Sequence, residues 1–267
     1  MTRWLVAALT AAACDVGAMD EVPFVVSPDN VTLTMLQMAK VGAQDYVIDL
    51  GSGDGRIIIT AARRFGASGL GVELVPALVE KSRGNARAAG VEQRARFREQ
   101  DLFKTDLSPA TVITMYLLPD VNLRLRPRLL KLQPGTRIVS HDWDMGEWKP
   151  DKTVVVPVPD KPVGVDKSSR IHLWVVPARI EGLWCGAGKA KGASMRIDQQ
   201  FQAFSAELID GPDTRPFVGH IEANIIRVPK IMNMTYDARE IRVTYAIKSS
   251  GLQGARFVRP RASGVCR

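Results

Sequence analysis

Residues 47–65 contain the feature that most restricts how this chain folds. Val47 to Leu50 form a short, mainly apolar run with β-branched residues, which predicts a buried strand. Three glycines follow at alternate positions: Gly51, Gly53 and Gly55. The residues from Ile57 to Phe65 then show a helical pattern. Glycine has no Cβ and a helix start has free N–H groups, so this unit predicts a loop that brings backbone close to a ligand.

Three classes of glycine-rich loop compete for this ligand. A phosphate-binding P-loop needs a lysine in its Gly-Lys-Ser/Thr sequence, and no lysine follows Gly55. The dinucleotide fingerprint has the spacing G-x-G-x-x-G, whereas this loop has G-x-G-x-G. Asp49 and Asp54 would also repel a pyrophosphate. They would attract a cation, and S-adenosylmethionine carries both a sulfonium and an ammonium group.

The first 177 residues alternate between strand and helix patterns. Predicted strands cover 45–50, 68–73, 94–99, 111–117 and 137–140, and predicted helices begin near Asn30, Arg56, Pro76 and Val121. Such alternation with short connections predicts an α/β domain, a parallel sheet with helices on both faces. Two more strand-like runs, 153–158 and 171–176, predict a hairpin added at the sheet edge.

Beyond Pro177 the helical periodicity ends. Apolar residues alternate with polar ones in several runs, separated by turn signals such as Asp210-Gly211-Pro212. This pattern predicts a small antiparallel all-β domain, which a barrel or a sandwich would satisfy equally. The predicted division is 1–18 as a signal peptide, 19–177 as the α/β domain and 178–267 as the β domain.

The charge of the chain is unevenly distributed. The hydrophobic share of 46% and the charged share of 24% are ordinary for a globular protein, and the net charge is +8. Residues 178–267 contain 14 Lys and Arg against 8 Asp and Glu, so most of the surplus belongs to the β domain. An acidic protein, a membrane surface or a nucleic acid could use this surplus. The chain has no Lys/Arg run and no RNA-binding aromatic signature, which disfavours nucleic acid.

The N-terminus and the cysteines bear on the compartment. Arg3 precedes a short apolar run, residues 4–13, and small residues follow, as in a secretory signal peptide. This predicts the cell envelope or periplasm, with the cytoplasm as the alternative. Outside that segment the cysteines are Cys185 and Cys266, which could form a disulfide or remain two free thiols. No metal-ligand spacing exists, so no metal site is expected.

The glycine loop and its acids resemble a known superfamily. Residues 49–55 resemble motif I of the class I S-adenosylmethionine-dependent methyltransferases, which implies a seven-stranded Rossmann-like sheet. In that superfamily an acid at the second strand end, here Glu73, binds the ribose hydroxyls, and an acid after the third strand, here Asp101, meets the adenine. The implied cofactor-binding residues are Asp49, Gly51, Gly53, Asp54, Gly55, Glu73, Asp101 and Leu102.

A narrower resemblance concerns the acceptor. Residues 49–56, 71–74 and 101–104 are similar to the protein-lysine methyltransferases that modify the ATP synthase c-subunit and the adenine nucleotide translocase. This implies N-methylation of a lysine on a protein partner, including a membrane protein, by in-line displacement. The signal-like N-terminus and the added β domain depart from that group. The alternatives are a small-molecule methyltransferase and a non-catalytic envelope protein that retains the fold.

The acceptor side of the site is expected at the ends of the fourth and fifth strands, which lie at the carboxyl edge of the sheet. This nominates Tyr116 to orient the amine, with Asp120 nearby and His141 as a proton acceptor. Many nucleic-acid N-methyltransferases carry Asn/Asp-Pro-Pro-Tyr where this chain has Tyr116-Leu117-Leu118-Pro119. The adenine- and DNA-methylating branch is therefore disfavoured.

Overall fold

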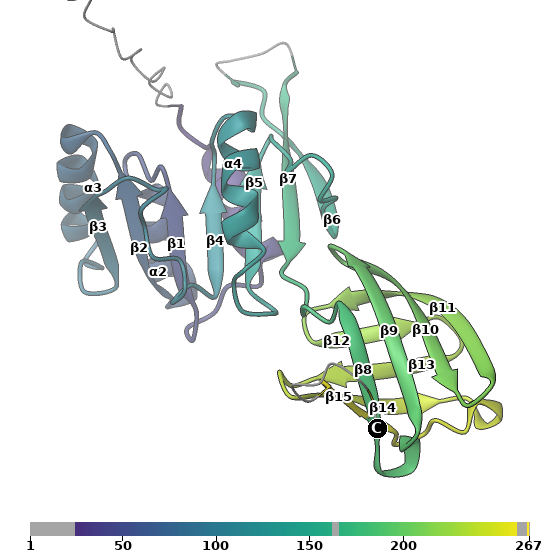
Figure 1. The fold of residues 1–267 in the computed structure, drawn as a ribbon. Helices are drawn as coiled ribbons and strands as arrows, with labels where there is room; N and C mark the ends of the chain where they lie inside the picture. The colour runs from purple at the N-terminus through teal and green to yellow at the C-terminus, as the bar shows by residue number, and fades with distance from the viewer. Residues whose placement is uncertain (1–24, 162–165, 261–265, 267) are drawn as a thin grey trace, which may run out of the picture.

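The computed structural model describes residues 25–161, 166–260 and 266, so the predicted signal peptide lies outside the described residues. Figure 1 shows an α/β domain followed by a separate all-β domain. The α/β elements are α1 Asp29–Met38, β1 Tyr46–Leu50, α2 Arg56–Phe65, β2 Ser68–Glu73, α3 Pro76–Ala88, β3 Ala95–Glu99, β4 Val112–Met115, α4 Pro119–Leu129, β5 Arg137–His141, β6 Lys152–Pro157 and β7 Ser168–Val175. The predicted strands and helices are confirmed to within a few residues.

The α/β domain contains one seven-stranded sheet. The strand order is β3-β2-β1-β4-β5-β7-β6, with the first five strands parallel and β7 antiparallel to both neighbours. The predicted edge hairpin is confirmed, but its second strand, β7, lies beside β5 and its first strand, β6, forms the edge. This order places the carboxyl ends of β1, β2 and β4 next to one another.

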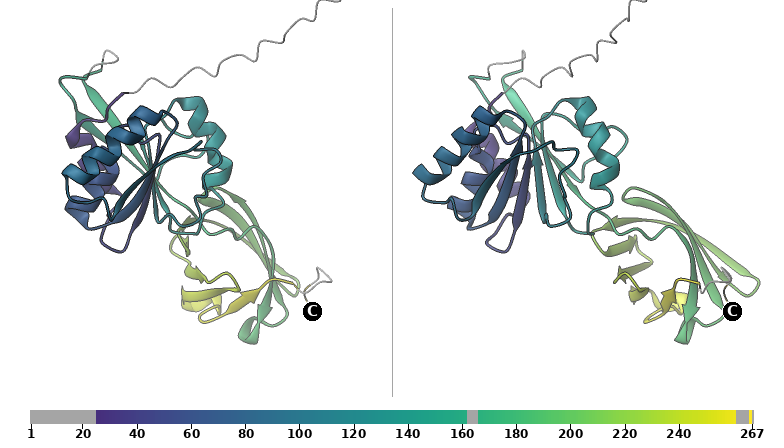
Figure 2. Two further views of the ribbon diagram at one scale, coloured as in Figure 1. Left: turned by 90° about the vertical axis from the view of Figure 1, so that its left-hand side faces the viewer. Right: turned by 60° about the vertical axis from the view of Figure 1, so that its left-hand side comes forward.

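Helices cover both faces of the sheet, as Figure 2 shows. Successive residues of β1 point to opposite faces, so Val47 packs with α1, α2 and α3 while Ile48 packs with α4. On the first face Met35 and Leu36 of α1 are fully buried, and on the second Leu125 of α4 is fully buried. Burial on both faces explains why the strands are mainly apolar rather than alternating.

The C-terminal domain is a closed antiparallel barrel. Its strands are β8 Gly182–Ala187, β9 Ala193–Gln200, β10 Ala203–Asp210, β11 Asp213–Glu222, β12 Ile225–Val228, β13 Met232–Tyr236, β14 Glu240–Ala246 and β15 Arg256–Val258. Pairing runs round the full circle, because β15 pairs with β8 and β8 with β9. Alternate residues, such as Phe204, Ala206 and Leu208 of β10, fill the interior. The predicted alternation is confirmed, and closure decides between barrel and sandwich.

Polar and aromatic contacts join the two domains. The Gln202 side-chain amide donates to the Lys149 carbonyl over 3.1 Å and to the Asp151 carboxylate over 3.2 Å. The Phe201 ring stacks on Trp148 at a centroid distance of 6.2 Å. The barrel end that contains residues 201 and 202 therefore packs against the sheet domain.

A disulfide joins Cys185 of β8 to Cys266, 81 residues further along the chain. The first of the two alternatives for these cysteines is confirmed. The link fastens the C-terminal residues to the barrel wall. No helix in the described part of the chain is long and apolar enough to span a membrane.

We expect the disulfide to stabilise the barrel by restricting the conformations of the unfolded chain. Loss of a disulfide typically lowers the free energy of unfolding by about 2–4 kcal/mol. The measurement is urea unfolding of the wild type and of the Cys185→Ala/Cys266→Ala double variant, each with and without dithiothreitol. Reductant should lower the stability of the wild type alone. Equal behaviour of the two proteins under both conditions would contradict the prediction.

Candidate active site

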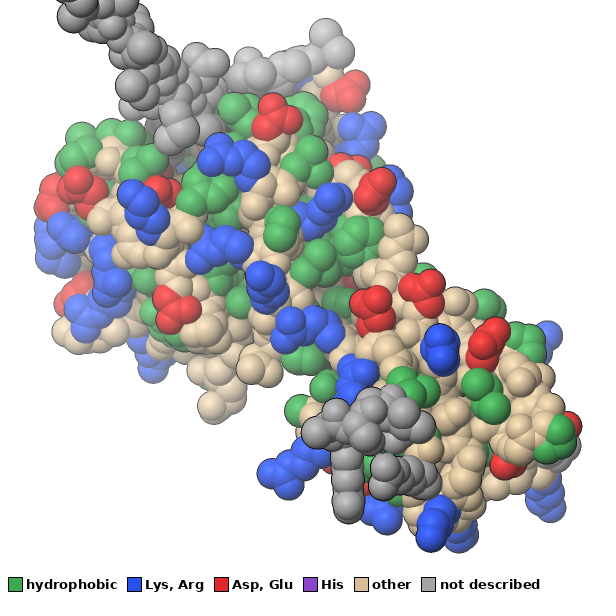
Figure 3. Space-filling view, viewed as in Figure 1, with side chains coloured by type: hydrophobic (Ala, Val, Ile, Leu, Met, Phe, Trp, Pro, Cys, Tyr) green, Lys and Arg blue, Asp and Glu red, His purple; other side chains and the backbone are tan. Residues whose placement is uncertain are grey.

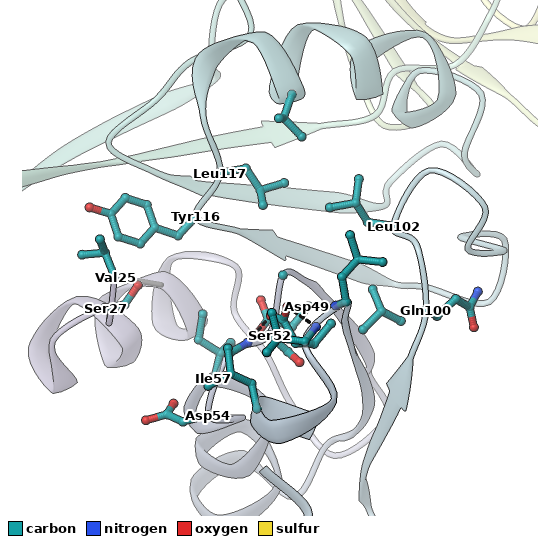
Figure 4. A pocket seen from close by; sticks show the side chains of 18 of the residues that line it. Val25, Ser27, Asp49, Ser52, Asp54, Ile57, Gln100, Leu102, Tyr116 and Leu117 are labelled. Atoms are coloured by element: carbon teal, nitrogen blue, oxygen red, sulfur yellow. Dashed lines mark hydrogen bonds between the residues drawn. The ribbon is translucent and has the colours of Figure 1, made fainter. Parts of the chain in front are cut away.

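A cavity of about 1080 Å³ opens at the carboxyl ends of the parallel strands (Figure 4). We call it the strand-end cavity. The loops after β1, β2, β3 and β4 line it, together with α4 and the segment before α1. Its lining residues are Val25, Val26, Ser27, Asp49, Gly51, Ser52, Gly53, Asp54, Arg56, Ile57, Val72, Glu73, Leu74, Val75, Pro76, Leu78, Gln100, Asp101, Leu102, Phe103, Tyr116, Leu117, Val121 and Arg124. Ligands of open α/β sheets bind at this edge.

The glycine turn forms one wall of the strand-end cavity. Gly51 has a φ of +76°, and a Cβ there would lie 2.9 Å from a Leu117 methyl group. Gly53 lines the cavity too, with a φ of +52°. Gly55, which was predicted to bind the cofactor, is not among the lining residues. A Cβ on Gly55 would meet the Phe97 ring at 2.6 Å, so this glycine allows the loop to pack on β3.

Asp49 is a buried carboxylate at the end of β1. It is 2% exposed and lines the strand-end cavity, and the Thr114 hydroxyl donates a hydrogen bond to it over 2.7 Å. The pKa of Asp49 is raised to about 7, mainly by burial and to a smaller extent by the charges of Glu73 and Asp54, while the hydrogen bond from Thr114 lowers it. A cationic ligand in the cavity would reverse this shift, because an opposite charge favours the ionised carboxylate.

Ser52 adds an unpaired polar atom to the same wall. Its side-chain oxygen is buried and has no hydrogen-bond partner among the described residues. The Ser52 side chain is drawn next to Asp49 in Figure 4. A buried hydroxyl without a partner is costly, so a ligand that supplies one would bind favourably here.

Glu73 is fixed by backbone amides at the end of β2. One carboxylate oxygen accepts from the Gly53 amide over 3.0 Å, and the other accepts from Leu74 over 2.8 Å and Val75 over 3.1 Å. Glu73 therefore links the glycine turn to the loop after β2. Asp49 and Glu73 both line the strand-end cavity.

Two of the predicted residues after β3 also reach the strand-end cavity. Asp101 lines it while accepting from the Phe103 amide over 2.8 Å, and the neighbouring Leu102 lines it as well. Gln100, which sequence reasoning did not select, lies beside them. Arg124 of α4 packs its guanidinium 4.1 Å from the centre of the Phe103 ring.

Asp54 has a role in holding the loop. Its carboxylate accepts from the Arg56 guanidinium at 3.0 Å and 2.8 Å, and in Figure 4 it points away from Ser52 and Asp49. Arg56 in turn donates to the Ser27 carbonyl over 2.9 Å. This arrangement ties the segment before α1 across the strand-end cavity. Sequence reasoning missed Ser27 and Arg56 as site residues, because their contact links segments 29 residues apart.

The three predicted catalytic residues have different positions. The Tyr116 ring lines the strand-end cavity and stacks on His141 at 3.8 Å. His141 lies behind that ring, 1% exposed, with Nδ1 2.9 Å from the Ser27 hydroxyl and Nε2 2.8 Å from the Ser169 hydroxyl. Burial lowers the pKa of His141, so its imidazole is neutral at pH 7. Asp120 is exposed in the first turn of α4 and does not line the cavity.

Burial of Asp49 should reduce the stability of the ligand-free protein as pH rises. The folded state holds the Asp49 proton more tightly than the unfolded chain, whose ordinary pKa is 3.8. Stability is therefore lost between about pH 4 and pH 7. We expect Asp49→Asn to become more stable than the wild type across this window, by about 4 kcal/mol in free energy of unfolding at pH 8. Urea unfolding at a series of pH values measures the difference.

Asp45→Asn is the control, because its effect on stability should depend on pH in the opposite direction. Burial raises the pKa of Asp45, but hydrogen bonds from Arg137 and Thr111 hold this pKa below its ordinary value. Removing this carboxylate should destabilise the protein above pH 5, and the deficit should shrink as pH falls. A stability difference between Asp49→Asn and the wild type that does not change with pH would refute the burial argument.

Comparisons with known proteins agree with this geometry. A model of the family described as ANTKMT methyltransferase domain matches residues 49–152. A protein-lysine N-methyltransferase of Saccharolobus islandicus is 44% identical over 137 residues, 51% of this chain and 85% of that protein. The mouse lysine N-methyltransferase of the ATP synthase c-subunit is 33% identical over 132 residues, 49% of this chain and 53% of that protein. The chain thus spans about half of the mouse relative.

A solved structure also matches. A crystal structure described as an RNA methyltransferase from Salinibacter ruber, in complex with S-adenosyl-L-homocysteine, is 48% identical. The match has a TM-score of 0.52 and covers 58% of this chain and 96% of that one. The sequence and structural matches agree on the fold and on the chemistry of the donor. This chain therefore belongs to the ANTKMT methyltransferase family, within the class I S-adenosylmethionine-dependent methyltransferases.

Proposed function

We propose that this protein transfers a methyl group from S-adenosylmethionine to the side-chain nitrogen of a lysine on a protein. The observation that carries the donor half is the convergence of Asp49, Glu73 and Asp101 on one cavity. The acceptor half is supported by the names of the Saccharolobus and mouse relatives, both lysine N-methyltransferases. Small-molecule methylation and a non-catalytic envelope role are the alternatives.

The strand-end cavity fits the cofactor on three structural grounds. Ser52 offers a buried hydroxyl without a partner among the described residues, and Asp49 offers a buried carboxylate that a cation would stabilise. Gly51 leaves space that a Cβ would fill. Asp49 and Ser52 would hold the methionine end, Glu73 the ribose, and Asp101 with Leu102 the adenine. Bound S-adenosylmethionine supplies an electrophilic methyl group.

The protein's contribution to methyl transfer is alignment of the acceptor. An in-line displacement depends mainly on the position of the attacking nitrogen, which must arrive neutral. Tyr116 is the polar side chain at the end of β4 that lines the cavity, while Leu117 and Val121 beside it exclude water. Burial, with a contribution from Asp142, raises the pKa of Tyr116, so its hydroxyl stays protonated at neutral pH. Tyr116 then orients the amine by hydrogen bonding rather than by acting as a base.

Two measurements test the proposal. Titration calorimetry of the full chain with S-adenosylmethionine should show saturable binding. No binding would refute the proposed enzymatic function. Transfer of a labelled methyl group should then be measured separately into the protein, RNA and small-molecule fractions of a lysate. Label in protein that acid hydrolysis releases as methyllysine supports the proposal. Label confined to RNA or to small molecules overturns the acceptor, and no label with intact binding favours the non-catalytic role.

Tyr116→Phe tests the orienting role. The variant keeps the ring that stacks on His141 but removes the hydroxyl, so the affinity for S-adenosylmethionine should stay within about twofold of the wild type. The turnover rate should fall by roughly 10²-fold, the scale of a misaligned nucleophile. Tyr46→Phe is the matched control, since Tyr46 lies at the amino end of β1, away from the cavity. An unchanged rate for Tyr116→Phe would exclude the hydroxyl from catalysis.

A further inference from the structure

The barrel has one end that faces away from the α/β domain, as Figure 1 shows. The strand registers place four connections there, namely residues 188–192, 211–212, 229–231 and 247–255. We call this the distal end. The opposite end contains residues 201 and 223, which lie against Trp148 and Gly135 of the α/β domain. The distal end is therefore free of the junction between the domains.

The distal end is basic. Exposed lysines occupy three of its connections: Lys189, Lys191, Lys230 and Lys248. Within the described residues none of them has an ion-pair partner, and Asp210, an acid at the same end, lies 3.9 Å from Arg215. Figure 3 shows Lys and Arg side chains along the lower rim of the barrel on the face in view. Part of the basic surplus of the C-terminal domain is thus unpaired charge at this end.

Several arginines on the barrel strands differ from these lysines, because acids accompany them. Arg227 lies 4.0 Å from Glu222, and Arg256 lies 3.4 Å from Glu240, which Arg242 also contacts. Pairing of this kind neutralises the charge locally. Two acids, Asp210 and the exposed Asp213, also lie at the distal end, but the four lysines outnumber them, so this surface keeps a net positive charge.

Apolar side chains are exposed among these lysines. Ile231 and Ile247 are each 36% exposed, and Tyr245 is 54% exposed. They are neighbours, because the Ile247 amide donates to the Ile231 carbonyl over 3.0 Å and Tyr245 lies two residues before Ile247. Lys230 and Lys248 flank the two isoleucines directly in the sequence. Adjacent exposed aliphatic side chains within a charged rim are typical of an interaction site.

The turn that presents Ile231 is strained. The Ile231 amide donates to the Val228 carbonyl over 3.1 Å, which makes Pro229 and Lys230 the central residues of a β-turn. Lys230 has a φ of +63°, a conformation that favours glycine or asparagine at this position. This turn places the exposed Lys230 directly before Ile231.

We propose that the distal end docks on the surface of an anionic lipid bilayer. The isoleucines insert at the boundary between the headgroups and the acyl chains, Tyr245 lies at the headgroup level, and the lysines contact anionic headgroups. Exposed aliphatic residues favour a bilayer over a nucleic acid, which is bound through stacking aromatics and arginine-rich grooves. This inference depends on the barrel alone and holds whatever acceptor the α/β domain methylates.

Cosedimentation of the full chain with lipid vesicles tests the proposal. Binding to phosphatidylcholine vesicles containing about one third phosphatidylglycerol should exceed binding to pure phosphatidylcholine by at least about tenfold. Sodium chloride at about 0.5 M should weaken it strongly. Equal binding to both vesicles, or none to either, overturns the proposal.

Paired variants locate the binding surface. Lys230→Gln/Lys248→Gln and Ile231→Ser/Ile247→Ser should each weaken vesicle binding by about tenfold or more. Lys131→Gln/Lys152→Gln and Val155→Ser make the same kinds of change at exposed positions of the α/β domain and should have no effect. Thermal melts check that each variant is folded. Equal losses of vesicle binding in the control variants would refute the assignment of membrane binding to the distal end.

Two further measurements make the outcome decisive. In Ile231→Trp, tryptophan fluorescence should shift to shorter wavelength and be quenched by brominated lipid if this residue enters the bilayer. Unchanged fluorescence during vesicle binding would contradict insertion. Binding of single-stranded RNA, lost in Lys230→Gln/Lys248→Gln without any vesicle binding, would assign the surface to nucleic acid and overturn the proposal.

Discussion

The buried carboxylate of Asp49 is the constraint around which the α/β domain is arranged. Asp49 ends the central strand β1, and the Thr114 hydroxyl of the neighbouring strand β4 is its hydrogen-bond donor. Burial alone makes its ionised form unfavourable. The free energy that the ligand-free site loses at neutral pH is what a cationic ligand recovers on binding. In the proposed function, the residue expected to weaken the ligand-free fold is thus also the one expected to favour a ligand with a sulfonium and an ammonium.

The loops around Asp49 are held by hydrogen bonds among residues that line the cavity. Glu73 fastens the glycine turn through the Gly53 amide, and Asp54 aligns Arg56, which reaches the Ser27 carbonyl. Ser27 also contacts His141, whose ring supports Tyr116. The donor side and the acceptor side of the cavity therefore share one network. This network explains why His141, buried and neutral, is better placed to position Tyr116 than to accept a proton from substrate.

Features that depend on neighbouring residues in the sequence could be predicted, whereas contacts between distant segments could not. β2 begins at Ser68 and ends at Glu73 as predicted, because a short apolar run with clear turns at both ends defines a strand locally. The acids at successive strand ends were predictable because parallel strands share one edge. The contact between Arg56 and Ser27, and the burial of His141, depend on how distant segments pack. Asp120 shows the limit, since a position just after β4 did not bring its side chain into the cavity.

The barrel shows the same division between local and long-range information. Alternation predicted its strands, but closure requires β15 to pair with β8 across some 70 residues of chain, which no local pattern encodes. Closure of the barrel also brings basic residues from separate connections together at one end. Once the strands are in register, Lys189, Lys230 and Lys248 lie together at the end that faces away from the α/β domain. Composition alone gives the sign of the charge, whereas the topology decides where that charge faces.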